Sequence, residues 1–225
     1  MRWDLILPNP LHMAELFGEN PLYYIDNWWS TLWVSVAASL LSLLMSFVVA
    51  VAGLRFPLIA RLISPITALS QSFPLQAIAP LIIIALGVGF HSKLAIASLI
   101  SFFPIYISMA SALQHTPKVY LAYLKVTKAS FWRGVRFVRF PIALPAIVAA
   151  TKVGFTLAVL GSVVAEFIQP DRGLGRIILM AQSQFDINII YVCVLLLVIQ
   201  GLAVFFTLSW IEFYLISTRT TEMAT

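Results

Sequence analysis

Long apolar stretches alternate with short polar segments, and this pattern constrains the fold more than any other feature of the sequence. The first stretch, at about 30–54, is long enough to cross a hydrocarbon core about 30 Å thick. Similar stretches follow at about 75–89, 94–113, 142–164 and 189–216. Charged residues make up 10% of the chain, against roughly 25% in a soluble domain. The sequence therefore predicts an all-α integral membrane protein with about five transmembrane helices.

The segments around these spans divide the chain into parts. Residues 1–29 combine acids with Tyr and Trp, a composition typical of a segment at the level of the lipid headgroups. Prolines between the first and third spans predict a short interfacial helix to about Ser70 and a break at 71–74 before the second span. Polar residues 91–93 are expected to link the second and third spans. The expected parts are an interfacial segment (1–29), a transmembrane domain (30–216) and a tail (217–225).

A basic run at 117–145 separates the third span from the fourth and holds six of the fourteen Lys and Arg residues. With five spans, nine Lys and Arg residues fall on the side of this run and four on the other, while Lys152 lies inside a span. Cytoplasmic loops carry the excess of Lys and Arg. We therefore expect the basic run and the C-terminus in the cytoplasm, and the N-terminus outside.

The basic run has a pattern of its own. Three lysines share one face of a helical projection, opposite an apolar face: Lys118, Lys125 and Lys128. Residues 118–128 are therefore expected to form an amphipathic helix along the inner membrane surface. A break at 129–130 then precedes the aromatic pair at 131–132 and three arginines spaced by three residues. This helix–turn–helix indicates docking to a protein partner, and the alternative is binding to anionic lipid.

Several classes of function receive no support from the sequence. The basic residues lie in loops between spans, where the membrane explains them without a nucleic-acid partner. The motif GxxxxGK[ST] is absent, so ATP hydrolysis by a P-loop mechanism is not expected in this chain. Cys193 is the only cysteine and the three histidines are isolated, so no metal site is expected.

Five motifs, taken in order, resemble a known family. They are SFPLQAIAPLIIIALGVG at 72–89, SFFPIYISMASAL at 101–113, FPIALP at 140–145, ATKVGFTLAVLGSVVAEF at 150–167 and GLGRIILMAQSQFD at 173–186. The sequence resembles the permease subunits of binding-protein-dependent ABC importers, in particular the nitrate, sulfonate and taurine branch. The resemblance covers almost the whole chain after residue 28. It implies the type I ABC importer permease fold, with a cytoplasmic coupling helix–turn–helix, in the bacterial inner membrane.

The resemblance also implies a role for the basic run. In that family the run is the EAA loop, whose cytoplasmic helices sit in a groove of the ATP-hydrolysing subunit. Here the coupling loop is 115–140. The family's Glu-Ala-Ala aligns with residues 122–124 and its glycine with Lys128. This chain has a different residue from the family's at each of these four positions. ATP and Mg²⁺ are expected in the partner ATPase, and no cofactor in this chain. The residues expected to couple to the ATPase are Lys118, Tyr123, Lys125, Lys128, Ser130, Phe131, Trp132, Arg133, Arg136 and Pro141.

Lys152 stands inside the fourth span, at a point where the family often has a basic residue. One interpretation is a cation that faces the translocation cavity and favours anionic substrates. The other is a structural lysine that pairs with a carbonyl or reaches the membrane interface. The side chains expected along the path between two copies are those of Gln71, Gln76, Lys152, Thr156 and Ser162, although small residues in such helices also serve close packing.

The polar connection between the fourth and fifth spans is expected to face outside and to receive a substrate-binding protein. Four residues are assigned to this contact: Glu166, Asp171, Gly173 and Gly175. The two glycines resemble the family's GLG turn and would provide backbone conformations that a turn needs. Solvated loop charge is the alternative interpretation of the acids.

These features together predict a permease subunit of an ATP-driven importer. The expected partners are a second permease subunit, identical or paralogous, two cytoplasmic ABC ATPase subunits, an external binding protein and the lipid bilayer. The resemblance implies small organic anions, nitrate-like ions or a vitamin-precursor heterocycle as the substrate. Two alternatives stay open: a degenerate or regulatory permease half acting as a membrane scaffold, and an ion-coupled carrier or channel.

Overall fold

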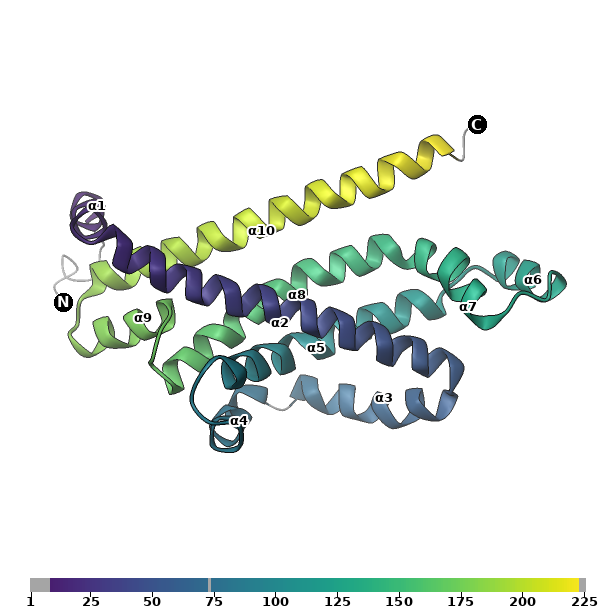
Figure 1. Ribbon diagram of the computed structural model, residues 1–225, viewed down its shortest axis with the longest axis horizontal. Helices are drawn as coiled ribbons and strands as arrows, with labels where there is room; N and C mark the ends of the chain where they lie inside the picture. The colour runs from purple at the N-terminus through teal and green to yellow at the C-terminus, as the bar shows by residue number, and fades with distance from the viewer. Residues whose placement is uncertain (1–8, 73, 223–225) are drawn as a thin grey trace. The chain divides into compact units, whose positions relative to one another are not determined.

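The computed structural model describes residues 9–72 and 74–222, without the side chains of 68, 71, 72, 75 and 215–222. Within these ranges all the regular structure is helical (Figure 1), which confirms the expected all-α class. The helices are α1 (Pro10–Glu19), α2 (Pro21–Arg55), α3 (Pro57–Ser72), the 3₁₀ turn η2 (Leu75–Ile78), α4 (Ala79–Leu86), α5 (Phe90–Gln114), α6 (Lys118–Val126), α7 (Phe131–Gly134), the π-helical turn η3 (Val135–Arg139), α8 (Phe140–Ile168), α9 (Leu174–Ser183) and α10 (Ile187–Glu222).

Four helical segments of the described chain are long and apolar enough to cross a membrane: Pro21–Arg55, Phe90–Gln114, Phe131–Ile168 and Ile187–Tyr214. They correspond to the first, third, fourth and fifth expected spans. The second expected span differs, because residues 75–86 form η2 and the eight-residue helix α4. Eight residues of α-helix reach only about 12 Å. Pro80 lies in the first turn of α4, where proline starts helices rather than continuing them.

Two helices begin earlier than the sequence suggested. Helix α2 begins at Pro21, so the Tyr and Trp residues at 23–29 belong to it and not to a separate interfacial segment. Helix α5 begins at Phe90, so residues 91–93 form its first turn instead of a link. The expected break at 71–74 agrees with the end of α3 at Ser72.

The basic run forms the expected helix–turn–helix, with α6 followed by a break at 127–130. Ser130 caps α7, because its hydroxyl oxygen accepts from the N–H of Arg133 at 3.5 Å. The turn η3 then leads directly into α8, and the N–H of Phe140 bonds to the carbonyl of Val135. Pro141 follows immediately and has no N–H to donate. The π-helical turn η3 is wider than an α-helical turn, and it lies where the regular α-helical bonding is interrupted by the proline.

The chain divides into two compact units. The first consists of residues 1–38, 75–100 and 155–204, and the second of 39–74, 101–154 and 205–225. The long helices α2, α5, α8 and α10 each contribute residues to both units.

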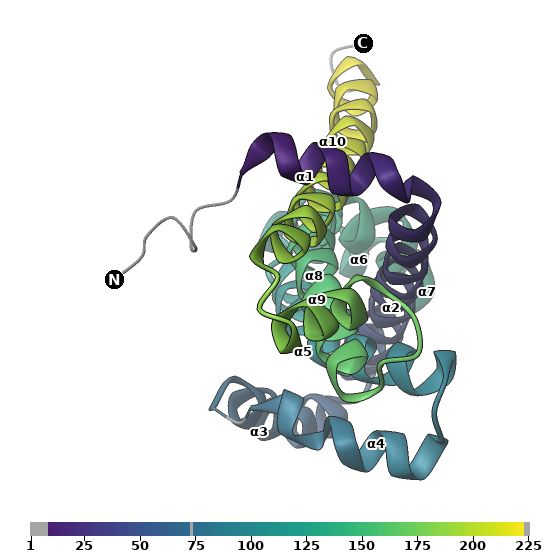
Figure 2. The same ribbon diagram turned by 90° about the vertical axis from the view of Figure 1, so that its left-hand side faces the viewer.

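In the first unit, apolar side chains of α1, α2, α9 and α10 form one core cluster. Figure 2 labels these four helices. Leu174 and the single cysteine, Cys193, are fully buried in it. Helices α5 and α8 approach closely in this unit. A Cβ added to Gly161 would lie 2.7 Å from Cα of Ala97, so the glycine serves close packing.

In the second unit, the core is built mainly on α5. Ile105, Met109 and Leu113 are buried on one side of α5 and pack with apolar residues of α2 and α8. The side chain of Ile105 fills the space that a Cβ at Gly154 would need. Small residues here therefore allow close helix contact, as expected for membrane helices.

A row of buried polar side chains runs along α2. Its members are spaced by three or four residues, so they share one face of the helix: Asn27, Thr31, Ser35, Ser39, Ser42 and Ser46. In the first unit, Ser35 bonds to Ser162 at 3.0 Å. In the second unit, Ser42 bonds to Ser101 at 2.8 Å. Ser35 and Ser42 therefore each meet another polar group inside the fold, which removes the penalty for burying their hydroxyls.

Candidate functional site

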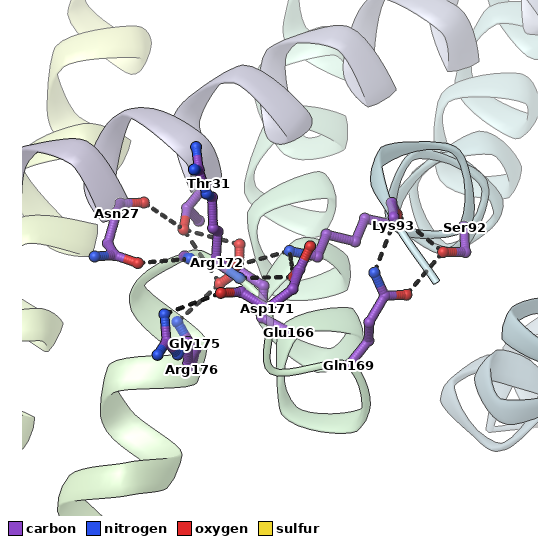
Figure 3. A network of polar contacts seen from close by, with 12 residues as sticks. Asn27, Thr31, Ser92, Lys93, Glu166, Gln169, Asp171, Arg172, Gly175 and Arg176 are labelled. Carbon is purple, nitrogen blue, oxygen red and sulfur yellow. Dashed lines mark hydrogen bonds and ion pairs between the residues drawn. The ribbon is translucent and has the colours of Figure 1, made fainter. Parts of the chain in front are cut away.

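Residues 169–175, which lead from α8 into α9, are held by polar side chains of three helices in the first unit (Figure 3). We call this segment the clamped turn. Figure 3 shows side chains of α2, α5 and α8 converging on it, including Thr31, Lys93 and Glu166. Almost all of these contacts join residues that are far apart in the sequence.

Glu166 lies in the last turn of α8 and is 0% exposed. Its carboxylate accepts hydrogen bonds from the hydroxyl of Thr31 at 2.9 Å and from the N–H of Gly175 at 2.8 Å. A buried carboxylate is strongly destabilising unless it receives such donors. Glu166 therefore ties the end of α8 to both α2 and the start of α9.

Two further backbone N–H groups of the clamped turn donate to side chains of α2. The N–H of Gly173 donates to Oδ1 of Asn27 at 2.9 Å, and the N–H of Leu174 donates to Oγ1 of Thr31 at 2.9 Å. Asn27 in turn donates from Nδ2 to the carbonyl of Tyr23 at 2.8 Å. The first N–H groups of a helix have no partner within it. Here the side chains of α2 and α8 supply those partners for α9.

Lys93 holds the other side of the turn. It is 2% exposed, and its Nζ donates to the carbonyl of Arg172 at 2.7 Å and forms an ion pair with Asp171. The N–H of Arg172 also donates to Asp171, at 2.7 Å. Partial burial alone raises the pKa of Asp171, but these hydrogen bonds outweigh it and lower the pKa of Asp171 below its ordinary value. Asp171 is therefore held in its charged form.

A second contact with α5 fixes the beginning of the turn. The buried hydroxyl of Ser92 donates to Oε1 of Gln169 at 2.8 Å, and Nε2 of Gln169 donates to the carbonyl of Gly89 at 3.2 Å. Gln169 therefore has both ends of its amide bonded. The turn is fixed at its first residue as well as at its last.

The glycines of the turn are required by its geometry. Gly173 has φ of +119°, in a region that other residues avoid. A Cβ at this position would overlap the carboxyl group of Glu166. A Cβ at Gly175 would lie 2.8 Å from Cβ of Glu166. The GLG motif thus provides room for the buried carboxylate as well as an unusual backbone conformation.

This geometry corrects the expected placement of Glu166. The residue belongs to α8 and is fully buried, whereas the sequence interpretation placed it in an exposed connection. Its carboxylate is consumed by contacts inside the fold, so no atom of it is left for an external partner. Gly173 and Gly175 are also buried. The side chain of Asp171 is 40% exposed and keeps a surface for the predicted contact.

Lys152 has a partner inside the second unit. Its Nζ donates to Oε2 of Glu212 in α10 at 2.5 Å and lies 5.1 Å from the ring centroid of Phe205. The side chains of Lys152 and Glu212 are only 15% and 27% exposed. Both belong to segments suited to cross a membrane. The pair is neutral as a unit, which lowers the penalty of placing either charge at that depth.

The other residues expected along the translocation path differ in their exposure. Ser162 is 0% exposed and bonds to Ser35, so it faces the interior of the first unit. Thr156 in α8 and Gln76 in η2 are exposed. Gln71 belongs to α3, but its side chain is outside the described set.

The residues expected to couple to an ATPase are exposed, except that Phe131 and Pro141 are half-buried. Tyr123 is 63% exposed and Trp132 is 69% exposed. Helix α6 has no buried residue, so its apolar face is open as well. Behind this surface, the guanidinium of Arg55 lies 5.6 Å from the ring centroid of Phe131, a cation–π contact that holds α7 against α2.

Several functional residues escaped sequence reasoning. Lys93 was assigned to a link between two spans and Glu212 was not singled out, although each pairs with a charge far away in the sequence. Arg139 donates to the carbonyl of Leu113 at 3.1 Å and so ties the basic run to the end of α5. The spacing of Asn27, Thr31 and Ser35 on one face of a transmembrane helix was the signal that would have found the row on α2.

The part of the chain that the structure describes contains no group of three His, Cys, Asp or Glu residues placed to hold a metal ion. The polar groups of the site instead bond to the backbone and to one another. The arrangement therefore positions the clamped turn against the helices around it.

Comparison with known proteins gives a consistent result. Residues 42–219 match the family described as "Binding-protein-dependent transport system inner membrane component". Over 150 residues the chain is 35% identical to the riboflavin transport system permease protein RibX of Chloroflexus aurantiacus, covering 67% of this chain and 56% of that protein. Over 181 residues it is 30% identical to the taurine transport system permease protein TauC of Escherichia coli, covering 76% of this chain and 65% of that protein. The matched part thus spans less than two thirds of either relative.

Among solved structures, a chain of the MetNI methionine ABC transporter in an inward-facing conformation has a TM-score of 0.78. The alignment covers 86% of this chain and 96% of that chain, with 19% sequence identity. At this level of identity the likeness concerns the fold alone.

Proposed function

The chain belongs to the family of inner membrane components of binding-protein-dependent transport systems and has the fold of type I ABC importer permeases, and from this premise we propose that it is the membrane-spanning subunit of an ATP-driven importer. In this role it forms the path of the solute and transmits the force of ATP hydrolysis from a separate ATPase. The observation that carries the proposal is the family match over residues 42–219, which includes the whole basic run.

The basic run is the proposed contact with the ATPase. Its coupling residues present cations and aromatic rings on an exposed surface, with Tyr123 and Trp132 largely uncovered. Aromatic and arginine side chains dominate the binding energy of protein interfaces. Two ATPase subunits, each with ATP and Mg²⁺, would engage two copies of this surface. The second copy comes from an identical or paralogous permease subunit.

Copurification tests this assembly. A tagged chain isolated from bacterial inner membranes should bring with it an ABC ATPase, and the complex should hydrolyse ATP faster when its external binding protein is added. Trp132→Ala should reduce the retained ATPase severalfold. Trp33→Ala is the matched control, because Trp33 has a similar exposure of 57% but lies on α2 in the first unit. A purified complex without any ATPase subunit would contradict the proposal.

Relatives of this chain are described as permeases for riboflavin and taurine, so the proposed substrate is a small organic anion or a vitamin-like heterocycle. A nitrate-like ion is also within the expected class. The external binding protein would select the solute, and Asp171 is the proposed contact residue on this chain. Uptake of labelled taurine, riboflavin and nitrate by the reconstituted complex distinguishes the three classes.

The pairing of Lys152 with Glu212 provides a test that distinguishes the two interpretations of this lysine. A lysine that attracts anionic substrate would have to exchange Glu212 for the substrate, whereas a structural lysine would keep its partner. Lys152→Met should impair uptake in both cases, because it leaves Glu212 without its cation. The double variant Lys152→Met with Glu212→Gln removes both charges. Restored uptake in the double variant means a structural pair, and continued loss means a cation that the substrate needs.

The runner-up function is a degenerate or regulatory permease half. The absence of the family's Glu-Ala-Ala at 122–124 favours it. Such a half would assemble with a paralogous permease while retaining little ATPase by itself. An ion-coupled carrier is the third candidate, and it is supported in the described chain by the three acids inside candidate spans, Asp26, Glu166 and Glu212. Uptake driven by an ion gradient without ATP would identify it.

A further inference from the structure

A groove of about 420 Å³ lies on the first unit, beside the clamped turn. Its lining includes Asp26, Trp29 and Trp33 of α2, Phe90 of α5 and Arg172 of the clamped turn. The aromatic side chains are not buried in the protein: Trp29 is 59%, Trp33 57% and Phe90 39% exposed. The groove therefore combines an acid, a base and three open aromatic rings.

The two charges in the groove are not used by the fold. Within the described residues, the carboxylate of Asp26 and the guanidinium of Arg172 form no ion pair or hydrogen bond with protein side chains or backbone. They line one groove without pairing with each other. In contrast, the neighbouring Asp171 and Arg176 are both engaged in the clamped turn. A ligand with one negative and one positive group would meet both free charges.

The setting of the groove points to the bilayer as the source of this ligand. Helices α2 and α5, which provide four of these five residues, are suited to cross a membrane. Tryptophan is enriched where such helices pass the headgroup region. Trp29 and Trp33 are spaced by four residues and so lie on one face of α2. Figure 3 shows Arg172 on the turn beside Asp171. The side chain of Arg172 lines the groove together with residues of α2.

We propose that this groove binds the headgroup of a zwitterionic phospholipid with a primary ammonium, of the phosphatidylethanolamine type. Arg172 binds the phosphate, which a guanidinium recognises through paired N–H donors. Asp26 accepts hydrogen bonds from the ammonium group, and the faces of the tryptophans add cation–π attraction. The aromatic rings also contact the glycerol and the first methylene groups of the acyl chains.

Lipid retention by the purified chain tests the proposal. The chain is exchanged into micelles that contain phosphatidylethanolamine, phosphatidylglycerol or phosphatidylcholine with identical acyl chains, and bound lipid is counted by native mass spectrometry. We expect at least fivefold more bound phosphatidylethanolamine than either of the other two lipids. Soluble phosphoethanolamine should not displace it at equal concentration, because the acyl chains contribute to binding.

The variants separate the two charges. Arg172→Gln should lower retention of phosphatidylethanolamine at least fivefold, and Arg172→Lys should recover only part of it, since lysine lacks the paired donors. Asp26→Asn should abolish the preference for phosphatidylethanolamine over phosphatidylglycerol while phosphate binding persists. Trp33→Leu should weaken retention of phosphatidylethanolamine. Trp132→Leu should not, because Trp132 is an exposed tryptophan of the second unit, outside the groove. Asp26 and Arg172 are exposed, so an unchanged melting temperature is expected for these variants.

Four results would overturn the proposal. They are equal retention of the three lipids by the wild type, unchanged retention in Arg172→Gln, full displacement by phosphoethanolamine, and a loss in Trp132→Leu equal to that in Trp33→Leu. If the groove instead receives the external binding protein, Arg172→Gln will weaken binding of that protein and leave lipid retention unchanged.

Discussion

The clamped turn and the basic run are both polar segments between long apolar helices, but they use their polar groups in opposite ways. In the clamped turn, three successive N–H groups, at 173–175, bond to side chains that are themselves buried. In the basic run, α6 has no buried residue and its lysines are exposed. The first segment therefore stabilises the fold, whereas the second is available to a partner.

This comparison teaches that charge alone does not mark a functional surface in a membrane protein. Glu166 and Lys93 are charged and close to a loop, yet they are fully enclosed and act on the backbone of the chain itself. The cations of α6 make no comparable contact within the described chain. Substitutions in the clamped turn should therefore change stability, and substitutions in the basic run should change assembly with partners.

The largest effect is expected for Gly173→Ala. The added methyl group forces an L residue into a backbone region reserved for glycine and collides with the carboxyl group of Glu166. The two penalties together should lower the free energy of unfolding by about 3 kcal/mol. Thermal unfolding in detergent, followed by tryptophan fluorescence, measures the loss.

Gly201→Ala is the matched control for this substitution, because nothing lies within 4 Å of a Cβ added at Gly201 in α10. Alanine favours a helix more than glycine does, so this variant should melt at or above the wild-type temperature. Equal melting temperatures for the two variants would mean that the clamped turn does not contribute to stability.

The next effect concerns the hydroxyl that joins α2 to the turn. Thr31→Val keeps the shape of the side chain but removes a donor to Glu166 and an acceptor for the N–H of Leu174. Buried groups left without partners should reduce stability by about 2 kcal/mol. The measurement is again the midpoint of thermal unfolding, compared with that of Thr151→Val.

Thr151 is a suitable control because it is also nearly buried, while its hydroxyl bonds only to the carbonyl of Ile147 in its own helix, at 2.8 Å. Loss of this hydroxyl should have little effect on the melting temperature, because the carbonyl of Ile147 already accepts a backbone hydrogen bond within α8. If Thr31→Val is as mild as Thr151→Val, the contact between α2 and the turn is dispensable.

The sequence predicted the segments of this fold better than it predicted their contacts. Apolar length and the basic run identified four spans and the helix–turn–helix, because both follow from composition along a continuous stretch. Residues 75–86 form two short consecutive helices instead of one long helix, because the prolines decide where the helices begin and end. The local pattern of apolar and polar residues predicts that a segment is helical and buried, but it does not predict how many residues the helix contains.

The contacts of the site required the three-dimensional structure. Glu166 follows a long apolar stretch, and a carboxylate there is typical of a helix end that reaches water. Its burial depends on Thr31 and Gly175, which no periodicity connects to it. The same holds for Lys152 and Glu212, separated by sixty residues. Only the motif GLG indicated a special turn, and it did so through backbone conformation rather than through its partners.

A smaller, pH-dependent effect is expected for Lys93→Met. The ion pair with Lys93 contributes to the lowered pKa of Asp171 in the folded protein. A lowered carboxyl pKa stabilises the fold above the unfolded pKa, near 4, and this stabilisation is lost as the pH falls through the folded value. Wild type should therefore be more stable than Lys93→Met at neutral pH, and the difference should shrink below about pH 4.

Chemical unfolding at several pH values measures this difference, and Lys125→Met provides the control, because Lys125 is an exposed lysine of α6. The control should show the same stability as wild type across the range. A difference between wild type and Lys93→Met that stays constant down to pH 3 would mean that the bond from Lys93 to the carbonyl of Arg172, and not the ion pair, carries the effect.

The smallest effect, and the one of opposite sign, is expected in the basic run at Lys128. This residue has φ of +48°, a left-handed conformation that is unfavourable for a side chain by about 1 kcal/mol or more. The related family has glycine at this position of its loop. Lys128→Gly should therefore stabilise the turn after α6 by up to about 1 kcal/mol, while Lys125→Gly, inside the helix, should destabilise by a similar amount. Thermal unfolding of the two variants compares them, and a loss of stability in Lys128→Gly would show that the lysine side chain, rather than the backbone, determines this turn.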